Sequence, residues 1–266
     1  MQKRIGGRTS SWWGRGKSVP RVSIRPGVSV LSVLRHLNYS PWFALAEFVD
    51  NAIQNFIENK ERLQKLHGHS SKLRVSIEVD ASSPGRITIR DNAAGIGIEA
   101  FPRAFRPAVI PPSRRGLSEF GMGMKSAACW FAPHWRVRTK ALGEHVERTV
   151  RFDIATIVKD ELEELALEEQ AADADAHFTE VALEDPHHVP VGRTLGKIKE
   201  HLCDIYRVFL RDGTLDLRFN GEQLAYVEPQ VLVAPYYKDE GGGIASGGRR
   251  YPLTLDTDSQ RRVSRR

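Results

Sequence analysis

Three short groups of residues carry side chains that could bind or act on a ligand, and the most informative lies in residues 118–131. Two glycines, Gly121 and Gly123, stand just before a segment that can form a helix, and Lys125 and Ser126 follow them. Glycine lets a ligand approach the bare main chain, and a helix N-terminus offers unpaired N–H groups with partial positive charge. The group predicts a phosphate cradle with Lys125 as a point charge, although an ordinary tight turn has the same Gly-x-Gly pattern.

The second group lies on a predicted amphipathic helix over residues 41–57. Ser40 suits the N-cap and Pro41 the first helical position, and apolar residues then recur at helical spacing. Glu47 and Asn51 are four residues apart, so they lie one above the other on the polar face. Glu47 could take a proton from water as a general base, and Asn51 could offer its carboxamide oxygen to Mg²⁺. The alternative is an ordinary helix with a solvated polar face.

The third group follows a predicted strand at residues 86–91, where apolar and polar residues alternate. Asp91 at the end of that strand could accept a hydrogen bond from an amino group. Gly95 and Gly97 would then let the chain bend close to a flat ligand. The alternative is a strand followed by a turn, because Asp91 and Asn92 both favour turns.

The order and spacing of the three groups resemble the GHKL ATPase superfamily. That superfamily includes type II topoisomerase ATPase subunits, MutL, the large heat-shock chaperone, sensor histidine kinases and MORC proteins. The matching patterns are Glu-x-x-x-Asn from Glu47, Asp-x-x-x-Gly-x-Gly from Asp91 and Gly-x-Gly-x-Lys from Gly121. Residues 120–126, Phe-Gly-Met-Gly-Met-Lys-Ser, look most like the MORC, chaperone and MutL branches, and the resemblance covers about residues 28–230.

The resemblance implies a role for each of these residues. Glu47 would activate the water that attacks the γ-phosphate of ATP, and Asn51 would hold Mg²⁺. Asp91 would accept the adenine amino hydrogen, which selects ATP over GTP. The remaining positions would shape the adenine pocket or hold the phosphates: Gly95, Gly97, Gly121, Gly123, Lys125 and Ser126. The chain departs from the family pattern Asp-Asn-Gly-x-Gly-Met, because Ala93 and Ala94 precede Gly95.

The coarse pattern of helices and consecutive antiparallel strand pairs lacks strict βαβ alternation. It predicts an α/β two-layer sandwich, with a mixed, mostly antiparallel sheet covered on one face by helices. The resemblance implies the same architecture, the Bergerat or histidine-kinase-like ATPase fold. We expect an ATP-binding domain at 28–230 with a lid at about 102–120, a basic segment at 1–27 and a Gly/Arg-rich, flexible tail at 231–266.

The remaining elements follow from periodicity and turn chemistry. Strands are expected at 73–79, 135–141, 146–154, 215–219 and 224–227, and a helix at 195–210. Asn220-Gly221 suits a type I′ turn between the last two strands. Residues 159–185 hold eleven acids and one lysine, and we expect a solvated helix and loop there, with a strand at 177–183.

Composition sets limits without identifying the function. The chain has 266 residues, 41% hydrophobic and 27% charged, as in ordinary globular domains. It has no apolar run long enough for a membrane span, and its basic start lacks the apolar stretch of a secretory signal. Cys129 and Cys203 are the only cysteines, which favours free thiols in the cytoplasm. The histidines show no zinc-ligand spacing with them.

Basic residues gather at the two ends of the chain. Residues 1–27 hold seven Lys or Arg and no acid, and residues 241–266 hold six Arg against two Asp, so the middle is net acidic. Such ends could bind nucleic acid phosphates, or simply be solvated tails. In this superfamily an N-terminal segment often crosses to a partner subunit, so a dimer strap at 1–27 is an equal alternative.

The sequence therefore favours a Mg²⁺-dependent ATPase of the MORC or MutL style, in which lid closure drives homodimerisation and action on nucleic acid or a partner protein. Relatives often take a catalytic lysine from a following domain, and Lys238 is a poor candidate, so slow or partner-dependent turnover is expected. The alternatives are a nucleotide-dependent dimerisation switch with little hydrolysis, a histidine-kinase-type protein kinase and an unrelated scaffold.

Overall fold

A computed structural model describes residues 27–106, 122–228, 232–233 and 252–253. Its main feature is an eight-stranded sheet in the order β5-β4-β3-β6-β2-β1-β7-β8. All neighbouring strands are antiparallel except β1 and β7, which run parallel. The strands are β1 (Leu73–Asp80), β2 (Arg86–Asp91), β3 (His134–Lys140), β4 (Val146–Asp153), β5 (Leu167–Ala171), β6 (Phe178–Glu184), β7 (Leu215–Phe219) and β8 (Glu222–Gln223).

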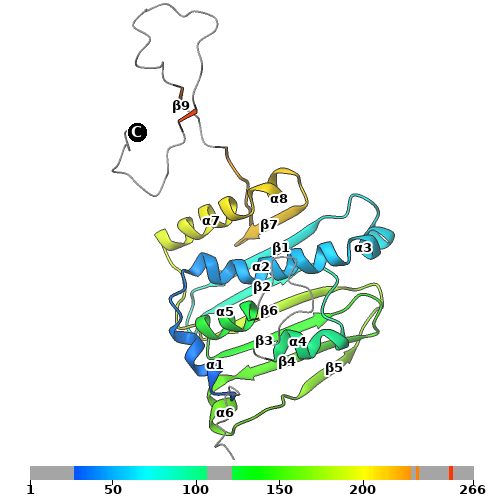
Figure 1. Ribbon diagram of the computed structural model, residues 1–266, viewed down its shortest axis with the longest axis vertical. Helices are drawn as coiled ribbons and strands as arrows, with labels where there is room; N and C mark the ends of the chain where they lie inside the picture. The colour runs from blue at the N-terminus through cyan, green and yellow to red at the C-terminus, as the bar shows by residue number, and fades with distance from the viewer. Residues whose placement is uncertain (1–26, 107–121, 229–231, 234–251, 254–266) are drawn as a thin grey trace, which may run out of the picture.

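Helices cover one face of this sheet, with α2 lying across its middle and α5, α4 and α7 beside it (Figure 1). The helices are α1 (Val30–Val33), α2 (Pro41–Glu58), α3 (Lys60–His67), α4 (Phe101–Phe105), α5 (Gly123–Phe131), α6 (Ile154–Lys159), α7 (Arg193–Ile205) and α8 (Arg207–Arg211), with short 3-10 turns η1 (Leu34–His36) and η2 (Ile98–Ala100). Among the described helices, none is both long and apolar enough to cross a bilayer.

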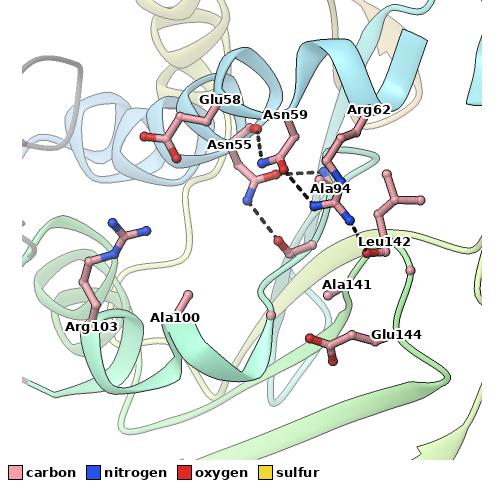
Figure 2. A pocket seen from close by; sticks show the side chains of 13 residues that line it. Asn55, Glu58, Asn59, Arg62, Ala94, Ala100, Arg103, Ala141, Leu142 and Glu144 are labelled. Carbon is pink, nitrogen blue, oxygen red and sulfur yellow. Dashed lines mark hydrogen bonds between the residues drawn. The ribbon is translucent and has the colours of Figure 1, made fainter. Parts of the chain in front are cut away.

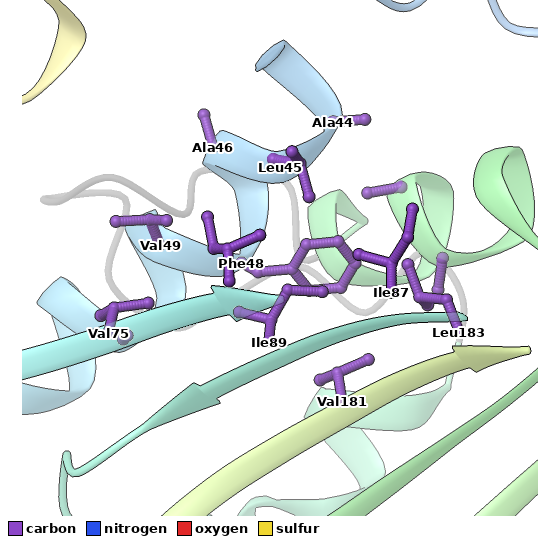
Figure 3. Packing of buried hydrophobic residues seen from close by; sticks show 14 of the residues in the cluster. Ala44, Leu45, Ala46, Phe48, Val49, Val75, Ile87, Ile89, Val181 and Leu183 are labelled. Carbon is purple, nitrogen blue, oxygen red and sulfur yellow. The ribbon is translucent and has the colours of Figure 1, made fainter. Parts of the chain in front are cut away.

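The core lies between α2 and the middle strands, as Figure 3 shows. Leu45, Phe48 and Val49 face the sheet because they recur at helical spacing, and strand residues such as Ile87 and Leu183 meet them by alternation. All five side chains are buried. Packing of this apolar stripe therefore fixes the rotation of α2, and with it the direction in which its polar residues point.

The opposite face of the sheet carries ion pairs between neighbouring strands. Arg90 lies 2.8 Å from Glu180, and Arg136 lies 3.1 Å from Glu184. These side chains occupy the strand positions that alternate with the buried ones, as expected for a sheet with one covered face. The predicted two-layer sandwich with a mixed, mostly antiparallel sheet is confirmed.

The acidic segment differs from its prediction. The solvated helix expected within residues 159–185 is wrong: the helix α6 ends at Lys159, and β5 adds an edge strand. Acidic side chains are compatible with a strand here because β4 supplies partners. Glu168 pairs with Arg151, and Glu169 pairs with Arg148, both across the strand pair. The strand expected at 177–183 is present as β6.

Smaller differences occur near the C-terminal end of the sheet. The helix expected at 195–210 is divided at Tyr206 into α7 and α8, and the strand expected at 224–227 is the two-residue β8 instead. Asn220 and Gly221 both have positive φ, in agreement with the predicted I′ turn. Ser40 is the N-cap of α2, but its side chain makes no capping hydrogen bond.

Some predictions fall outside the described residues. They include the strap at 1–27 apart from Gly27, most of the lid, Gly121 and nearly all of the tail. Within the tail, β9 (Leu232–Val233) and β10 (Pro252–Leu253) pair as a separate two-stranded sheet.

Candidate active site

Glu47 meets the glycine-rich segment at the start of α5. The two helices pack side by side, and a Cβ atom built on Gly123 would lie 2.0 Å from Oε2 of Glu47. Only a residue without a side chain leaves space for the carboxylate in this position. The fold therefore brings the first and second sequence groups into contact, as the sequence predicted them to act together.

Burial and a neighbouring charge make Glu47 more basic. Loss of water contact raises the pKa of Glu47, and the nearby Asp50 carboxylate raises it further. Burial also raises the pKa of Asp50, opposed by a hydrogen bond from the Tyr206 hydroxyl. Asn51 is half-buried on α2, one turn beyond Glu47. This end of the site thus gathers hard oxygen donors around a carboxylate suited to accept a proton.

Asp91 ends β2 beneath the helical layer. Burial raises the pKa of Asp91 to about 7, while N–H groups of Ala93 and Thr179 favour the ionised form. The Ala93 N–H lies 2.9 Å from Oδ1. An amino group that donated a hydrogen bond here would replace part of the water that this carboxylate has lost.

The loop after Asp91 is held by a residue that the sequence analysis did not single out. Asn55 accepts a hydrogen bond from the Ala94 N–H at 2.8 Å and donates one to the Gly95 carbonyl oxygen at 2.9 Å. Asn55 lies one helical turn beyond Asn51, so the spacing Glu47, Asn51, Asn55 could have identified it.

Gly95 must be glycine for two reasons. Its φ is +72°, and a Cβ there would lie 2.0 Å from the Lys140 carbonyl oxygen. Gly97 has an ordinary extended backbone, and a Cβ on it would lie 3.1 Å from Oε1 of Glu144. The backbone therefore requires glycine at Gly95, whereas only limited space disfavours a side chain at Gly97.

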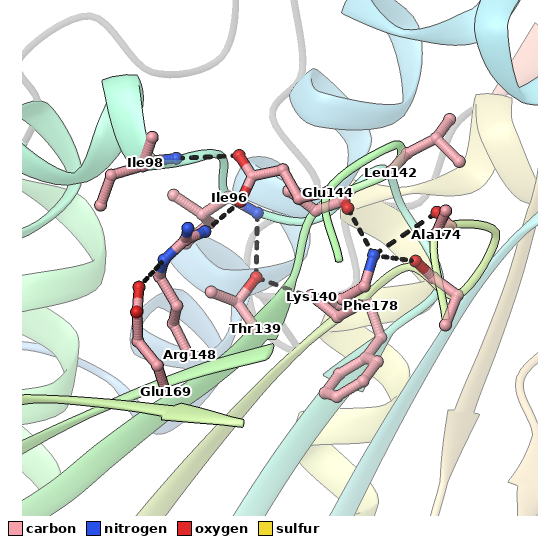
Figure 4. Close-up of polar contacts among 12 residues, drawn as sticks. Ile96, Ile98, Thr139, Lys140, Leu142, Glu144, Arg148, Glu169, Ala174 and Phe178 are labelled. Carbon is pink, nitrogen blue, oxygen red and sulfur yellow. Dashed lines mark hydrogen bonds and ion pairs between the residues drawn. The ribbon is translucent and has the colours of Figure 1, made fainter. Parts of the chain in front are cut away.

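Two residues of β3 support this loop from below, as Figure 4 shows. The Ile96 N–H donates to Oγ1 of Thr139 at 2.9 Å, and that hydroxyl lies 3.0 Å from the Phe178 carbonyl oxygen. Lys140 is fully buried, and its ammonium donates to the carbonyl oxygens of residues 141, 174 and 176. This buried cation with three oxygen partners fixes two turns beside the loop, one that begins at residue 141 and one that contains residues 174 and 176.

A polar cavity of about 390 Å³ opens beside the loop (Figure 2). It lies between the end of α2, the loop, α4 and the turn after β3. Its lining includes Gly95 and Gly97 but not Glu47 or Lys125, so it does not contain the carboxylate end of the site. The lining residues are Asn55, Glu58, Asn59, Arg62, Ala94, Gly95, Gly97, Ala100, Arg103, Ala141, Leu142, Gly143 and Glu144.

Lys125 and Ser126 occupy the first turn of α5 and are both buried. The ammonium of Lys125 donates to the carbonyl oxygens of Arg103 at 3.2 Å and Ala104 at 2.8 Å, near the end of α4. Burial lowers the pKa of Lys125 to about 8. Lys125 thus links the glycine-rich segment to the helix that precedes residues 107–121.

Comparison with known families agrees with this geometry. Residues 39–186 match the family described as histidine kinase-, DNA gyrase B- and HSP90-like ATPase. That range contains all three sequence groups and is more than half of the chain. The chain belongs to this family, and it is therefore an ATPase domain of the GHKL type. No curated protein sequence matches it significantly.

Solved structures of low sequence identity share the fold. The ATPase region of Saccharomyces cerevisiae topoisomerase II bound to ICRF-187 (dexrazoxane) has 16% identity and a TM-score of 0.50, covering 69% of this chain and 48% of that one. The ATPase and transducer domains of DNA topoisomerase II from Balamuthia mandrillaris have 13% identity, the same TM-score and the same coverage. This chain thus spans about half the length of those structures, and the likeness concerns the fold.

Proposed function

We propose that this chain binds ATP with Mg²⁺ between α2, α5 and the loop after β2, and that it hydrolyses the γ-phosphate with Glu47 as general base. One observation carries the proposal: the Glu47 carboxylate lies against Gly123, at the N-terminus of α5. A phosphate held by the N–H groups of that helix end would place its terminal oxygens near a carboxylate of raised pKa.

The adenine ring of ATP would bind at the other end of the site, away from Glu47. Asp91 is a desolvated carboxylate that can accept the adenine amino hydrogen, and guanine offers an oxygen at that position instead. The loop held by Asn55 would lie along the adenine ring, and Gly95 would let the main chain approach that ring closely. This arrangement supports a preference for ATP over GTP.

The donor set near Glu47 fits magnesium, which prefers oxygen ligands and keeps several waters. Asn51 would hold the ion together with phosphate oxygens. Bound magnesium would offset negative charge on the phosphates during transfer of the γ-phosphoryl group to water. Glu47 would orient the attacking water and accept its proton, and Lys125 would add positive charge beside the phosphates.

We further propose that nucleotide binding is coupled to lid closure and to association of two copies, with nucleic acid or a protein as the eventual target. The contact between Lys125 and the end of α4 supports the coupling. A phosphate would compete with the two carbonyl oxygens for this ammonium, and α4 contains the first residues of the predicted lid. The MORC or MutL style of the glycine-rich segment is the reason for the proposed target class.

Phosphate release by Glu47→Gln tests the catalytic assignment. The amide keeps the size of the side chain but cannot accept a proton, so we expect at least a hundredfold loss of turnover with nucleotide affinity retained. Glu61→Gln removes an exposed carboxylate on α3 and serves as the matched control. Turnover of Glu47→Gln equal to that of the control would remove Glu47 as the base.

A further inference from the structure

Two histidines meet edge to edge beside the loop that follows Asp91. His67 is the last residue of α3, and His177 directly precedes β6, 110 residues further along the chain. Their Nε2 atoms lie 2.6 Å apart, whereas the ring centroids are 4.9 Å apart and the ring planes are tilted by 54°. The two rings therefore meet through their nitrogen atoms and do not stack.

The second nitrogen of His177 determines which proton its ring carries. Nδ1 of His177 lies 2.9 Å from the Ala93 carbonyl oxygen, which can only accept, so this nitrogen carries a hydrogen. In the neutral ring, Nε2 of His177 then has a lone pair directed at His67. Metal-binding histidines share this arrangement, because their other ring N–H donates to a carbonyl oxygen that sets the tautomer and the direction of the ring.

Both histidines stand on elements that other contacts hold in place. The turn before His177 is fixed by the buried ammonium of Lys140 (Figure 4). In α3, Arg62 donates to the Leu142 carbonyl oxygen at 2.8 Å, so the helix that carries His67 is tied to the turn after β3. Groups held in this way lose little conformational freedom when they bind a ligand.

The spacing of the two nitrogens suits a metal ion after a small rotation of one ring. Two nitrogens bound to a tetrahedral Zn²⁺ ion are about 3.3 Å apart. His67 is exposed, so its ring can turn outward by this small amount while His177 stays in place. Among the residues that the structure describes, no third His, Cys, Asp or Glu completes a set, so water would fill the other positions. Imidazole ligands favour zinc, nickel and copper over magnesium.

We propose that His67 and His177 bind one divalent transition-metal ion, with Zn²⁺ as its representative, which joins α3 to the start of β6. On binding, the proton on Nε2 of His67 moves to Nδ1 of the same ring by exchange with water, so both Nε2 atoms coordinate and both rings stay neutral. The site uses nitrogen donors, unlike the oxygen donors proposed for Mg²⁺ around Asn51, and it requires no nucleotide.

Calorimetric titration of Zn²⁺ into the nucleotide-free chain, prepared without an added histidine tag, tests the site. We expect one Zn²⁺ per wild-type chain and an affinity weaker by about tenfold or more in His67→Gln and in His177→Gln. The matched control, His145→Gln, removes an exposed histidine elsewhere and should bind like wild type. Mg²⁺ at the same concentration should give no heat in any of these chains without nucleotide.

Thermal unfolding tests whether the ion joins the two elements. Zn²⁺ at tenfold excess over its Kd should raise the Tm of the wild type by roughly 4 °C and leave that of His67→Gln unchanged. His67→Gln alters an exposed helix end and keeps an N–H donor for Nε2 of His177, so it separates metal binding from the hydrogen bond between the two side chains.

Two results would overturn the metal site: no Zn²⁺ binding by folded wild-type chain, or equal Zn²⁺ affinity in the wild type and His67→Gln. Either would leave the two histidines as a hydrogen-bonded pair only. Zn²⁺ that binds without raising the Tm would overturn the link between α3 and β6. Because these measurements use no nucleotide, none of the three results bears on the proposed binding and hydrolysis of ATP.

Discussion

Burial decides what single side chains at this site can do. It raises the pKa of Asp91 to about 7 and lowers that of Lys125 to about 8, so both groups titrate close to neutral pH. Each would regain a favourable partner from a nucleotide, because an amino group suits the carboxylate and a phosphate suits the ammonium. The free domain therefore holds ionisable groups in positions that cost it stability, as expected at a binding site.

This cost predicts a pH dependence of stability that Asp91→Asn should remove. The pKa of Asp91 in the folded chain lies above its usual 3.8, so its contribution to stability is complete below about pH 4. It is lost as the pH rises toward 7, at up to about 1.4 kcal/mol per pH unit, and is constant above that. Urea unfolding of the wild type and of Asp91→Asn should be measured from pH 5 to 8. The difference between their free energies of unfolding should change with pH up to about pH 7. Parallel curves across that range would contradict the assignment.

Residue types and spacing singled out Glu47, Asn51 and Asp91, because each proposed role demands one kind of side chain. They could not pair His67 with His177, 110 residues away, since that contact exists only after the sheet has formed. Asn55 lies between these cases: its helical spacing was visible, but its bonds to the loop after Asp91 required the fold.

Among the helices and strands, the contact between α2 and α5 determines the position of Glu47, the proposed general base. Gly123 is the first residue of α5, where the helix itself does not require glycine, yet it faces the Glu47 carboxylate without any side chain. Glycine at this position is thus a packing requirement of the site and not of the helix.

Gly123→Ala should separate stability from activity. We expect unfolding free energy within about 1 kcal/mol of wild type, because helix propensity and crowding oppose each other, and turnover reduced at least tenfold because Glu47 is displaced. Gly196→Ala in α7 is the control, since a Cβ there meets nothing within 4 Å. It should gain up to about 1 kcal/mol and keep full activity. Full activity in Gly123→Ala would mean that Glu47 does not work from its observed position.

The sequence predicted elements well where periodicity was strong, as for α2 and the pair β1 and β2. The eleven acids in residues 159–185 predict a solvated helix and loop, and this prediction fails at β5. The partners of those acids, such as Arg151, stand on the neighbouring strand β4. Charge within one segment cannot reveal charge supplied by another.

At the scale of the whole molecule, the site is assembled from segments far apart in the chain. The parallel pairing of β7 with β1 brings the α7–α8 junction back over α2. One layer of helices therefore joins Glu47, the glycine-rich segment and the C-terminal helices. The body of the chain is net acidic and its ends are basic. Contact between the basic ends of one copy and the acidic body of a second copy would therefore bring opposite charges together.

We expect this single site to bind adenosine triphosphate, and calorimetric titration with a non-hydrolysable ATP analogue and Mg²⁺ measures that binding. Saturable heat corresponding to one nucleotide per chain, and much weaker heat with the matching GTP analogue, is the predicted result. No heat from a chain that is folded by circular dichroism would show that the site does not bind ATP.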